Sequence, residues 1–242
     1  MKPNSKFLNS GIVDTALVIV LIDLDGTLLP LDAWDPVFQE VSRLIAERAN
    51  IEWSQVYRAA KELNKALLRR FDIKAFDWDY IFTEVAHNLG VHTNVRVNEV
   101  LIKYVRGFKP YDGAIELLKM IKDLGHKIVI ATNGLYSYQS IVINELGFSK
   151  YIDSIRTPDK VGCPKNCREF FDNAHVMIGD NPLFDVYYPS MFGLVTIFVG
   201  DWDKRLNYVR DVWGLDLSGI KPTYSCKNIS EVMQVIPKLL NG

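Results

Sequence analysis

The chain has 242 residues, of which 48% are hydrophobic and 24% are charged, proportions that are ordinary for a soluble globular protein. The formal net charge of −1 excludes a global electrostatic attraction to nucleic acid or to an anionic membrane, so recognition of an anion such as phosphate has to be local. No segment is long enough to span a bilayer, and we expect neither a nucleic-acid partner nor a membrane partner.

The chain contains three cysteines, Cys163, Cys167 and Cys226. A small and odd number of cysteines is typical of a reducing compartment, so we expect a cytoplasmic protein whose cysteines are small, half-buried thiols. Cys163 and Cys167 could also be half of a zinc site, although no second closely spaced pair follows them.

The first predicted element is a buried strand in the stretch LVIVLIDLDGTLLP, residues 17–30. Residues 1 to about 14 are expected to form a loosely ordered tail before it. The branched apolar run ends in Asp23 and Asp25, which are followed by Gly26. An unpaired carboxylate inside a core costs several kcal/mol or becomes neutral. We therefore expect both carboxylates at the rim of the core, where α/β sheets carry their chemistry.

Helical spacing of apolar residues dominates from Asp35 to about Phe108. Four stretches carry it: DPVFQEVSRLIAERA, EWSQVYRAAKELNKALLRRF, DWDYIFTEVAHNLG and NVRVNEVLIKYVRGF. Asp35, which precedes a proline, is the expected N-cap of the first helix, and Asp77 is that of the third. Four helices with short connections and no strand among them predict a helical bundle.

Two groups of side chains in this bundle have expected positions. Most of its aromatic residues should lie in the bundle core, with one or two facing a substrate: Trp34, Trp53, Phe71, Phe76, Trp78, Tyr80 and Phe82. The basic cluster of Lys65, Arg69 and Arg70 is expected on a solvated helix face.

From Lys109 onward, apolar runs that end in polar residues alternate with amphipathic helices. The runs are HKIVIATNG, AHVMIGDN and LVTIFVGDW, and PTYSCKNISEVMQVIPKLL adds a strand and a helix. The charged stretch DWDKRLNYVRD is expected to be an exposed turn and helix. This alternation predicts an α/β fold with a doubly wound parallel sheet. We assign residues 1–31 and 109–242 to this core, and residues 32–108 to an all-helical cap inserted after the first strand.

Three predicted strands end in chemically useful side chains, and the ends of parallel strands meet at one edge of a sheet. These side chains are Asp23 and Asp25, then Thr132 and Asn133, then Asp180 with Asp185 after it. Several carboxylates at one edge repel one another unless a cation lies among them. A site rich in oxygen and poor in imidazole suits Mg²⁺.

Such a site can transfer a phosphoryl group. A carboxylate can attack phosphorus and form an acyl-phosphate, and a metal ion can neutralise the repulsion between the two anions. A second carboxylate, two residues along the strand, can protonate the leaving oxygen and then deprotonate the incoming water. A hydroxyl such as that of Thr132, a backbone N–H and a lysine would hold the phosphoryl oxygens.

These residues resemble the motifs of the haloacid dehalogenase-like superfamily, in its phosphatase branch. The stretch DLDGTL resembles the first motif of the family, IVIATNG the second and VMIGDNPLFD the fourth. The stretch KPYDGAIELLKMIKDLGHKIVIATNG leads up to the second motif and includes it, and it is similar to the corresponding stretch of the family along its whole length. The resemblance covers nearly all of the chain, and it implies a Rossmann-like core whose helical cap occupies the position of our predicted insertion.

The resemblance also implies a role for each residue. Asp23 would be the nucleophile and a metal ligand, and Asp25 would be the general acid and base that gives the metal its backbone carbonyl. Thr132 and Asn133 would bind the transferring phosphoryl group. Two further aspartates would bind the metal: Asp180 directly, and Asp185 directly or through water.

The third motif of the family supplies a lysine, commonly in a Lys-Pro-x-Pro pattern with an aromatic residue soon after it. Here the corresponding stretch is VGCPKNCREFF, which lacks those prolines. Lys165 fits by the preceding Gly-x-x pattern and by Phe171, six residues later. Lys160 is the alternative.

The resemblance implies a Mg²⁺-dependent phosphatase that hydrolyses a small phosphorylated metabolite through an aspartyl-phosphate. Three alternatives stay open. A phosphomutase of the same family would retain the phosphoryl group, and a 2-haloacid dehalogenase would work without metal, although Asp25 argues against it. A binding or regulatory protein could keep the fold with little turnover. The sequence does not indicate the oligomeric state.

Overall fold

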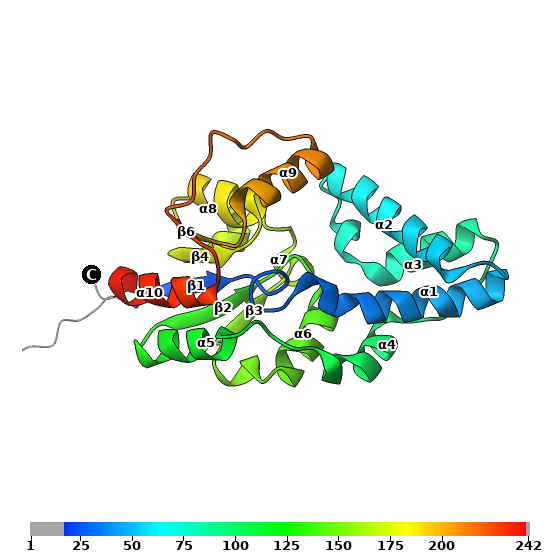
Figure 1. Ribbon diagram of the computed structural model, residues 1–242, viewed down its shortest axis with the longest axis horizontal. Coiled ribbons are helices and arrows are strands. Elements are labelled where there is room, and N and C mark those ends of the chain that lie inside the picture. The colour runs from blue at the N-terminus through cyan, green and yellow to red at the C-terminus, as the bar shows by residue number, and fades with distance from the viewer. Residues whose placement is uncertain (1–16, 241–242) are drawn as a thin grey trace, which may run out of the picture.

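The computed structural model describes residues 17–240, and the predicted N-terminal tail lies outside them. At the centre lies a parallel sheet of six strands in the order β3-β2-β1-β4-β5-β6 (Figure 1). The strands are β1 (Ile19–Ile22), β2 (Lys127–Ala131), β3 (Ser154–Arg156), β4 (Val176–Gly179), β5 (Val195–Val199) and β6 (Tyr224–Cys226). The chain moves outward from β1 in one direction through β2 and β3, and in the other through β4, β5 and β6. A doubly wound sheet of this order carries its ligands beside β1, where the direction changes.

Both faces of the sheet are covered, which explains why its central strands are apolar at successive positions. On one face, Ile22 belongs to the same buried cluster as residues of α5 (Ala114–Asp123) and α10 (Ile229–Leu240). On the other face, Leu21 and Met177 pack with Phe170 and Phe171. Further helices of the core are α6 (Tyr136–Glu145), α7 (Pro158–Val161), α8 (Tyr188–Met191) and α9 (Trp202–Trp213).

The short strand β3 is an element that the sequence pattern did not predict. It pairs with β2 at the edge of the sheet, and its sequence SIR has one apolar residue. Asp153 fixes its entry, because its backbone N–H donates to the Ile128 carbonyl at 2.8 Å and its Oδ2 accepts from the Ile128 N–H at 2.8 Å. This segment is therefore a strand because it pairs with β2, and not because its own sequence alternates between apolar and polar residues.

Four α-helices lie between β1 and α5, side by side at the right of Figure 1. They are α1 (Asp35–Ala49), α2 (Trp53–Arg69), α3 (Trp78–Asn88) and α4 (Val97–Tyr104). The prediction of a doubly wound α/β core with an inserted all-helical cap is confirmed. The residue boundaries of the cap stay a prediction.

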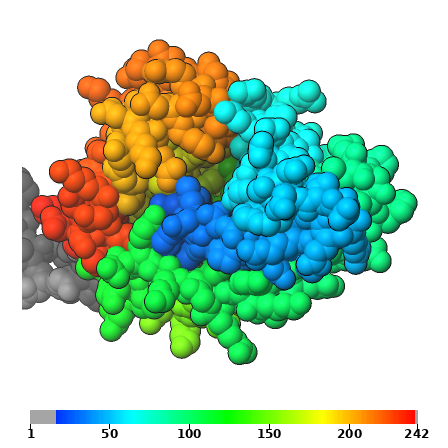
Figure 2. All heavy atoms as spheres, turned by 45° about the vertical axis from the view of Figure 1, so that its right-hand side comes forward, coloured from blue at the N-terminus to red at the C-terminus, as the bar shows by residue number. Residues whose placement is uncertain are grey.

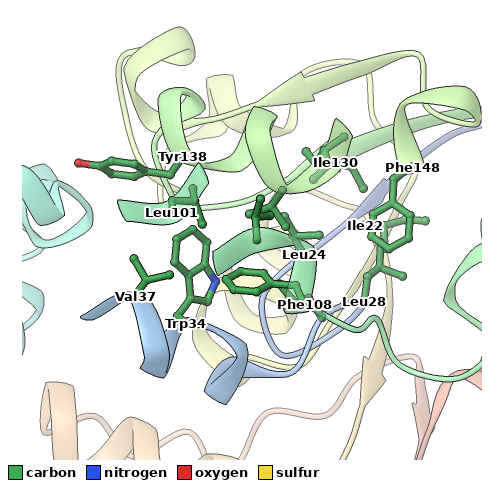
Figure 3. Packing of buried hydrophobic residues seen from close by; sticks show 14 of the residues in the cluster. Ile22, Leu24, Leu28, Trp34, Val37, Leu101, Phe108, Ile130, Tyr138 and Phe148 are labelled. Atoms are coloured by element: carbon green, nitrogen blue, oxygen red, sulfur yellow. The ribbon is translucent and has the colours of Figure 1, made fainter. Parts of the chain in front are cut away.

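The two chain segments that join this cap to the core meet beside the sheet (Figure 3). Trp34 lies on the outgoing segment and Phe108 on the returning one, and their rings contact edge to face with centroids 5.6 Å apart. Both side chains are buried with Leu24 and Leu28, which follow β1. The cap is thus anchored to the core next to Asp25.

Of the two predicted N-caps in the cap, that of Asp77 is confirmed and that of Asp35 is wrong. Asp77 caps α3, because its carboxylate accepts from the Tyr80 N–H at 3.0 Å. Asp35 is the first residue of α1 and makes no such bond, since a 3₁₀ turn over Leu31–Trp34 runs directly into the helix. Its carboxylate instead accepts from the Tyr57 hydroxyl at 2.9 Å.

None of the helices within residues 17–240 combines the length and the apolar character that a membrane span requires.

Candidate active site

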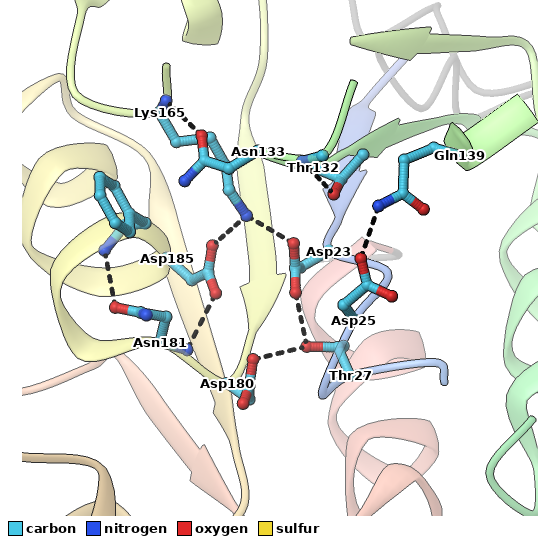
Figure 4. Close-up of polar contacts among 12 residues, drawn as sticks. Asp23, Asp25, Thr27, Thr132, Asn133, Gln139, Lys165, Asp180, Asn181 and Asp185 are labelled. Atoms are coloured by element: carbon cyan, nitrogen blue, oxygen red, sulfur yellow. Dashed lines mark hydrogen bonds and ion pairs between the residues drawn. The ribbon is translucent and has the colours of Figure 1, made fainter. Parts of the chain in front are cut away.

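Polar side chains from the carboxyl ends of β1, β2 and β4 gather around a cavity of about 280 Å³ (Figure 4). Asp23, Thr132 and Asp180 each follow directly after one of these strands. The structure brings all the predicted site residues into the lining of this cavity: Asp23, Asp25, Thr132, Asn133, Lys165, Asp180 and Asp185.

Three carboxylates form the centre of the cluster. Asp23, Asp180 and Asp185 each offer one oxygen, and these oxygens lie within 4.8 Å of one another. The three side chains are 6%, 5% and 0% exposed, respectively. The Thr27 hydroxyl lies 3.4 Å from an oxygen of Asp23 and 3.5 Å from one of Asp180. A buried set of oxygen donors with no imidazole fits Mg²⁺.

Two glycines of the motifs make room for these carboxylates. Gly26 has a φ of 94°, which disfavours any side chain, and a Cβ there would collide with the Asp180 carboxylate. A Cβ at Gly179 would collide with the side chain of Asp185 in the same way. The glycines thus allow the backbone to approach the acidic groups closely.

Lys165 lies among the carboxylates. Its ammonium donates to Asp23 Oδ1 at 2.6 Å and to Asp185 Oδ1 at 2.7 Å, and the side chain is almost completely buried. Burial lowers the pKa of Lys165, but the charges of Asp185 and Asp23 outweigh it and raise that pKa above its usual value. The alternative lysine, Lys160, lies over the ring of Tyr136, 4.6 Å from its centroid.

Asp25 lies beside this cluster with both oxygens hydrogen-bonded. Oδ1 accepts from Trp34 Nε1 at 2.7 Å, and Oδ2 accepts from Gln139 Nε2 at 2.6 Å. Removal from water raises the pKa of Asp25 to about 6; the charge of Asp23 also raises it, and the bonds from Trp34 and Gln139 oppose the rise. A carboxyl group with such a pKa can both hold and release a proton near neutral pH.

The residues after β2 support this arrangement. The Thr132 hydroxyl accepts from the Gly134 N–H at 3.1 Å, and Asn133 Oδ1 accepts from the Lys165 N–H at 2.9 Å. The Asn133 side chain therefore holds the backbone of Lys165. A Cβ at Gly134 would collide with the Gln139 amide, so this glycine lets Gln139 reach Asp25.

Helix α9 contributes a cation that the sequence pattern did not assign to the site. Arg205 forms an ion pair with Asp180, and Tyr208 and Trp213 line the cavity. Burial raises the pKa of Asp180, the charge of Asp23 adds to the rise, and Arg205 opposes it. Most charged residues of the stretch DWDKRLNYVRD are exposed on a helix, as expected, but Arg205 turns toward the cavity and is an exception. Figure 2 shows α9 and α2 side by side over this region.

The cavity is charged at its base and aromatic toward the cap. Phe76 and Trp78 come from the cap, Phe184 and Trp213 come from the core, and Asn64 adds one amide between them. Two of the cap aromatics thus line the cavity. Arg69 is exposed, as expected for a solvated face, and its guanidinium also donates to the Val212 carbonyl of the core at 3.1 Å.

The expectation of free thiols is wrong for two of the three cysteines. Cys163 and Cys167 form a disulfide, whereas Cys226 is free and buried. The two cysteines are four positions apart in the sequence, so the disulfide closes a tight loop. The disulfide also removes the two thiolates that the zinc alternative needs.

A family model described as haloacid dehalogenase-like hydrolase matches residues 18–186. The chain belongs to this hydrolase family. The match spans β1, the helical cap and both β2 and β4, and it ends just after Asp185. A comparison with curated proteins found no match.

Solved structures share the fold of this hydrolase. A haloacid dehalogenase-like phosphatase from Thermococcus onnurineus has a TM-score of 0.72 at 21% identity, over 91% of this chain and 98% of that one. A hydrolase of the family from Bacillus subtilis, YfnB, bound to magnesium, has a TM-score of 0.62 at 20% identity, over 90% and 98%. L-2-haloacid dehalogenase from Xanthobacter autotrophicus has a TM-score of 0.63 at 12% identity, over 92% and 99%.

Sequence reasoning missed four residues around the predicted site of this hydrolase: Thr27, Trp34, Gln139 and Arg205. Thr27 stands inside the first motif, so its position next to Asp23 and Gly26 was a usable signal. Trp34 is only nine positions from Asp25, whereas Gln139 is 114 positions from it. Nothing in the local pattern of Trp34, Gln139 or Arg205 distinguishes them from ordinary helix residues.

Proposed function

We propose that this hydrolase is a Mg²⁺-dependent phosphatase that acts on a small phosphomonoester through an aspartyl-phosphate on Asp23. The observation that carries the proposal is the buried cluster in which the Lys165 ammonium bridges Asp23 and Asp185. Asp25 stands two residues farther along the chain, with its pKa raised toward neutrality. A nucleophile, a positive clamp and an acid–base group are thus available at one cavity.

The acidic cluster supports the metal requirement. Four carboxylates, Asp23, Asp25, Asp180 and Asp185, face two cations, Lys165 and Arg205, so two negative charges remain when all the carboxylates are ionised. We propose that Asp23, Asp180 and Asp185 hold Mg²⁺ with side-chain oxygens, and that Asp25 adds its backbone carbonyl. The ion, when bound, supplies charge neutralisation for the attack of one anion on another.

The other residues have roles that follow from their positions. The Asp23 carboxylate attacks phosphorus, while the Lys165 ammonium and the Thr132 hydroxyl bind the phosphoryl oxygens. Asn133 holds the Lys165 backbone with its side chain, so the phosphoryl contact we propose for Asn133 is through its backbone N–H. Asp25 gives its proton to the leaving oxygen and later takes one from the attacking water.

The lining of the cavity favours a particular leaving group. Its phosphate end is charged, whereas the end toward the cap is built from Phe76, Trp78 and Trp213. At about 280 Å³ the cavity suits a small molecule, and its walls suit one with an apolar or flat portion. We propose that the substrate is a small phosphorylated metabolite of this kind.

The test is a screen of phosphorylated metabolites with Mg²⁺, scored by released phosphate. Asp23→Asn is the matched control, since it removes the nucleophilic anion and keeps the side-chain shape. We expect turnover by the wild type, a loss of at least about a thousandfold in the variant, and a variant that stays folded. Wild-type activity in the variant would remove the proposed nucleophile.

Further assays separate the alternatives. Chloride release from 2-chloropropionate in the presence of a chelator would indicate a dehalogenase. Transfer of the phosphoryl group to a second sugar phosphate, without free phosphate, would indicate a mutase. Ligand binding without turnover across the panel would indicate a binding protein.

A further inference from the structure

Lys165 is the central residue of a loop that a disulfide closes. The loop runs Cys163–Pro164–Lys165–Asn166–Cys167, and the Cα atoms of its two cysteines lie 6.3 Å apart. The lysine that bridges Asp23 and Asp185 therefore stands inside a covalent ring.

Few backbone hydrogen bonds tie this segment to distant parts of the chain. Residues 162–167 lie between α7 and a 3₁₀ turn at Arg168–Phe171, and they belong to no helix or strand. Three N–H groups of the segment donate to neighbouring carbonyls: Gly162 to Pro158 at 2.8 Å, Asn166 to Pro164 at 2.7 Å and Cys167 to Pro164 at 3.4 Å. Within residues 17–240, only the Lys165 N–H of this segment donates to a residue distant in the sequence, to Asn133 Oδ1 at 2.9 Å. A loop with so few backbone hydrogen bonds is expected to have low local stability unless a covalent link restrains it.

The disulfide restrains the backbone on both sides of Lys165, because a covalent ring restricts the φ and ψ angles of all the residues that it contains. The restraint matters because the flexible side chain of Lys165 has to reach two carboxylates at 2.6 and 2.7 Å. Misplacement of a reacting or orienting group by about 1 Å can cost on the order of a hundredfold in rate.

We propose that the Cys163–Cys167 disulfide is a positioning element for Lys165, and that its reduction reversibly lowers phosphoryl transfer. This inference rests on the proposed function. The reduction is a two-electron exchange, in which a dithiol breaks the S–S bond, supplies two protons to form two thiols, and becomes a cyclic disulfide itself. Both cysteines are half-buried, so a small reductant can reach them.

The first measurement establishes the redox state. Thiol titration of the oxidised protein in denaturant should find one thiol, that of Cys226, and titration after reduction should find three. Three thiols in the protein before any reductant is added would overturn the proposal.

The second measurement is turnover of para-nitrophenyl phosphate with Mg²⁺, before and after treatment with dithiothreitol. We expect kcat to fall about tenfold or more, KM to change less, and the activity to return after reoxidation. A Cys226→Ser variant is the matched control and should respond to the reductant as the wild type does. Equal kcat in both redox states would overturn the proposal.

Two variants test whether the effect acts through the lysine. The double variant Cys163→Ser, Cys167→Ser should have the low kcat of the reduced protein and should not respond to dithiothreitol. In a Lys165→Ala background, reduction should have no further effect on kcat, because the group that the disulfide positions is absent. A loss in that background as large as in the wild type would show a general structural effect and overturn the proposal.

Hydrogen exchange gives a readout that does not depend on activity. The Lys165 amide, bonded to Asn133 in the oxidised loop, should exchange faster after reduction, while the amides of β1 should not change. If no phosphomonoester is turned over in either redox state, the proposed function fails and exchange alone decides whether the disulfide holds the loop. Equal exchange rates would overturn the inference.

Discussion

At the scale of single residues, the site depends on the hydrogen-bond partners of its carboxyl groups. Asp25 has one partner from the core helix α6, Gln139, and one at the start of the cap, Trp34. Both bonds stabilise the ionised carboxylate and therefore lower its pKa, against the larger effect of burial. The balance leaves the pKa at about 6, so each partner adjusts the pH range in which Asp25 can donate a proton.

Replacement of Gln139 by leucine tests this adjustment. The change removes the 2.6 Å bond to Asp25, so the pKa of Asp25 rises further and the group stays protonated to higher pH. In a pH profile of kcat for an alkyl phosphate, whose leaving oxygen needs a proton, we expect the alkaline limb to move up by as much as about one pH unit. With para-nitrophenyl phosphate, whose leaving group departs without a proton, the shift should be smaller. An alkaline limb that moves to lower pH would contradict the assignment.

The two candidate lysines can be compared directly. Lys165→Met removes a buried ammonium from Asp23, and we expect kcat to fall on the order of a hundredfold. Lys160→Met removes an exposed ammonium that lies over Tyr136, and we expect kcat within about twofold of the wild type. Steady-state kinetics of the two variants under the same conditions checks both expectations, and the reverse order would make Lys160 the clamp.

At the scale of elements, two helices from different parts of the chain close the cavity together. Helix α2 belongs to the cap and α9 to the core, and Arg69 in the last turn of α2 donates to the carbonyls of Asp211 and Val212. These carbonyls lie at the C-terminal end of α9, which attracts a cation because of the helix dipole. The contact lies next to Trp213, which lines the cavity, so it couples the position of the cap to the substrate site.

Arg69→Ala tests this contact. The variant loses two hydrogen bonds of an exposed side chain, one of them half-buried, so we expect the free energy of unfolding to change by about 1 kcal/mol or less. Because the cap is held less firmly over the cavity, KM should rise several-fold while kcat stays close to that of the wild type. Arg70→Ala is the matched control, since Arg70 is the exposed neighbour in the sequence and should leave KM unchanged. Equal KM values for the two variants would show that the contact has no part in substrate binding.

At the scale of the whole molecule, the core is built around a buried excess of negative charge. Burial raises the pKa of Asp185 to about 6, with Lys165 opposing the rise, and burial also raises that of Asp180. Folding therefore takes up protons at these groups. The metal-free protein should lose stability as the pH rises from about 4 through about 6.

Mg²⁺ should reverse this loss. When the free Mg²⁺ concentration is a hundred times the dissociation constant, binding adds about 2.7 kcal/mol to the free energy of unfolding. For a chain of this size, this corresponds to a rise of roughly 5 to 10 °C in the melting temperature. Thermal unfolding at pH 7.5 with and without Mg²⁺ measures the rise, and a chelator should abolish it. At pH 5 the rise should be smaller, because protons compete for Asp180 and Asp185. A rise that does not depend on pH would place the ion elsewhere.

The sequence by itself determined the layout of this protein. Apolar runs and helical spacing are local signals, so they predicted the alternating core, the inserted helices and the polar residues at the ends of β1, β2 and β4. The identities of Asp23, Asp25, Asp180 and Asp185 as candidate residues also came from these local patterns. The short strand β3 was not predicted, because it is a strand through its pairing with β2 and not through its own composition.

Only the tertiary structure decided which distant residues meet. Lys165 reaches Asp23 across 142 positions of sequence and Gln139 reaches Asp25 across 114, and no local pattern encodes either contact. The same holds for Arg205 at Asp180 and for the face of α9 turned toward the cavity. The disulfide beside Lys165 depends on the path of a loop without regular structure. The physical reason is that local periodicity reports how each element folds, whereas the partners of a buried charge depend on how all the elements pack.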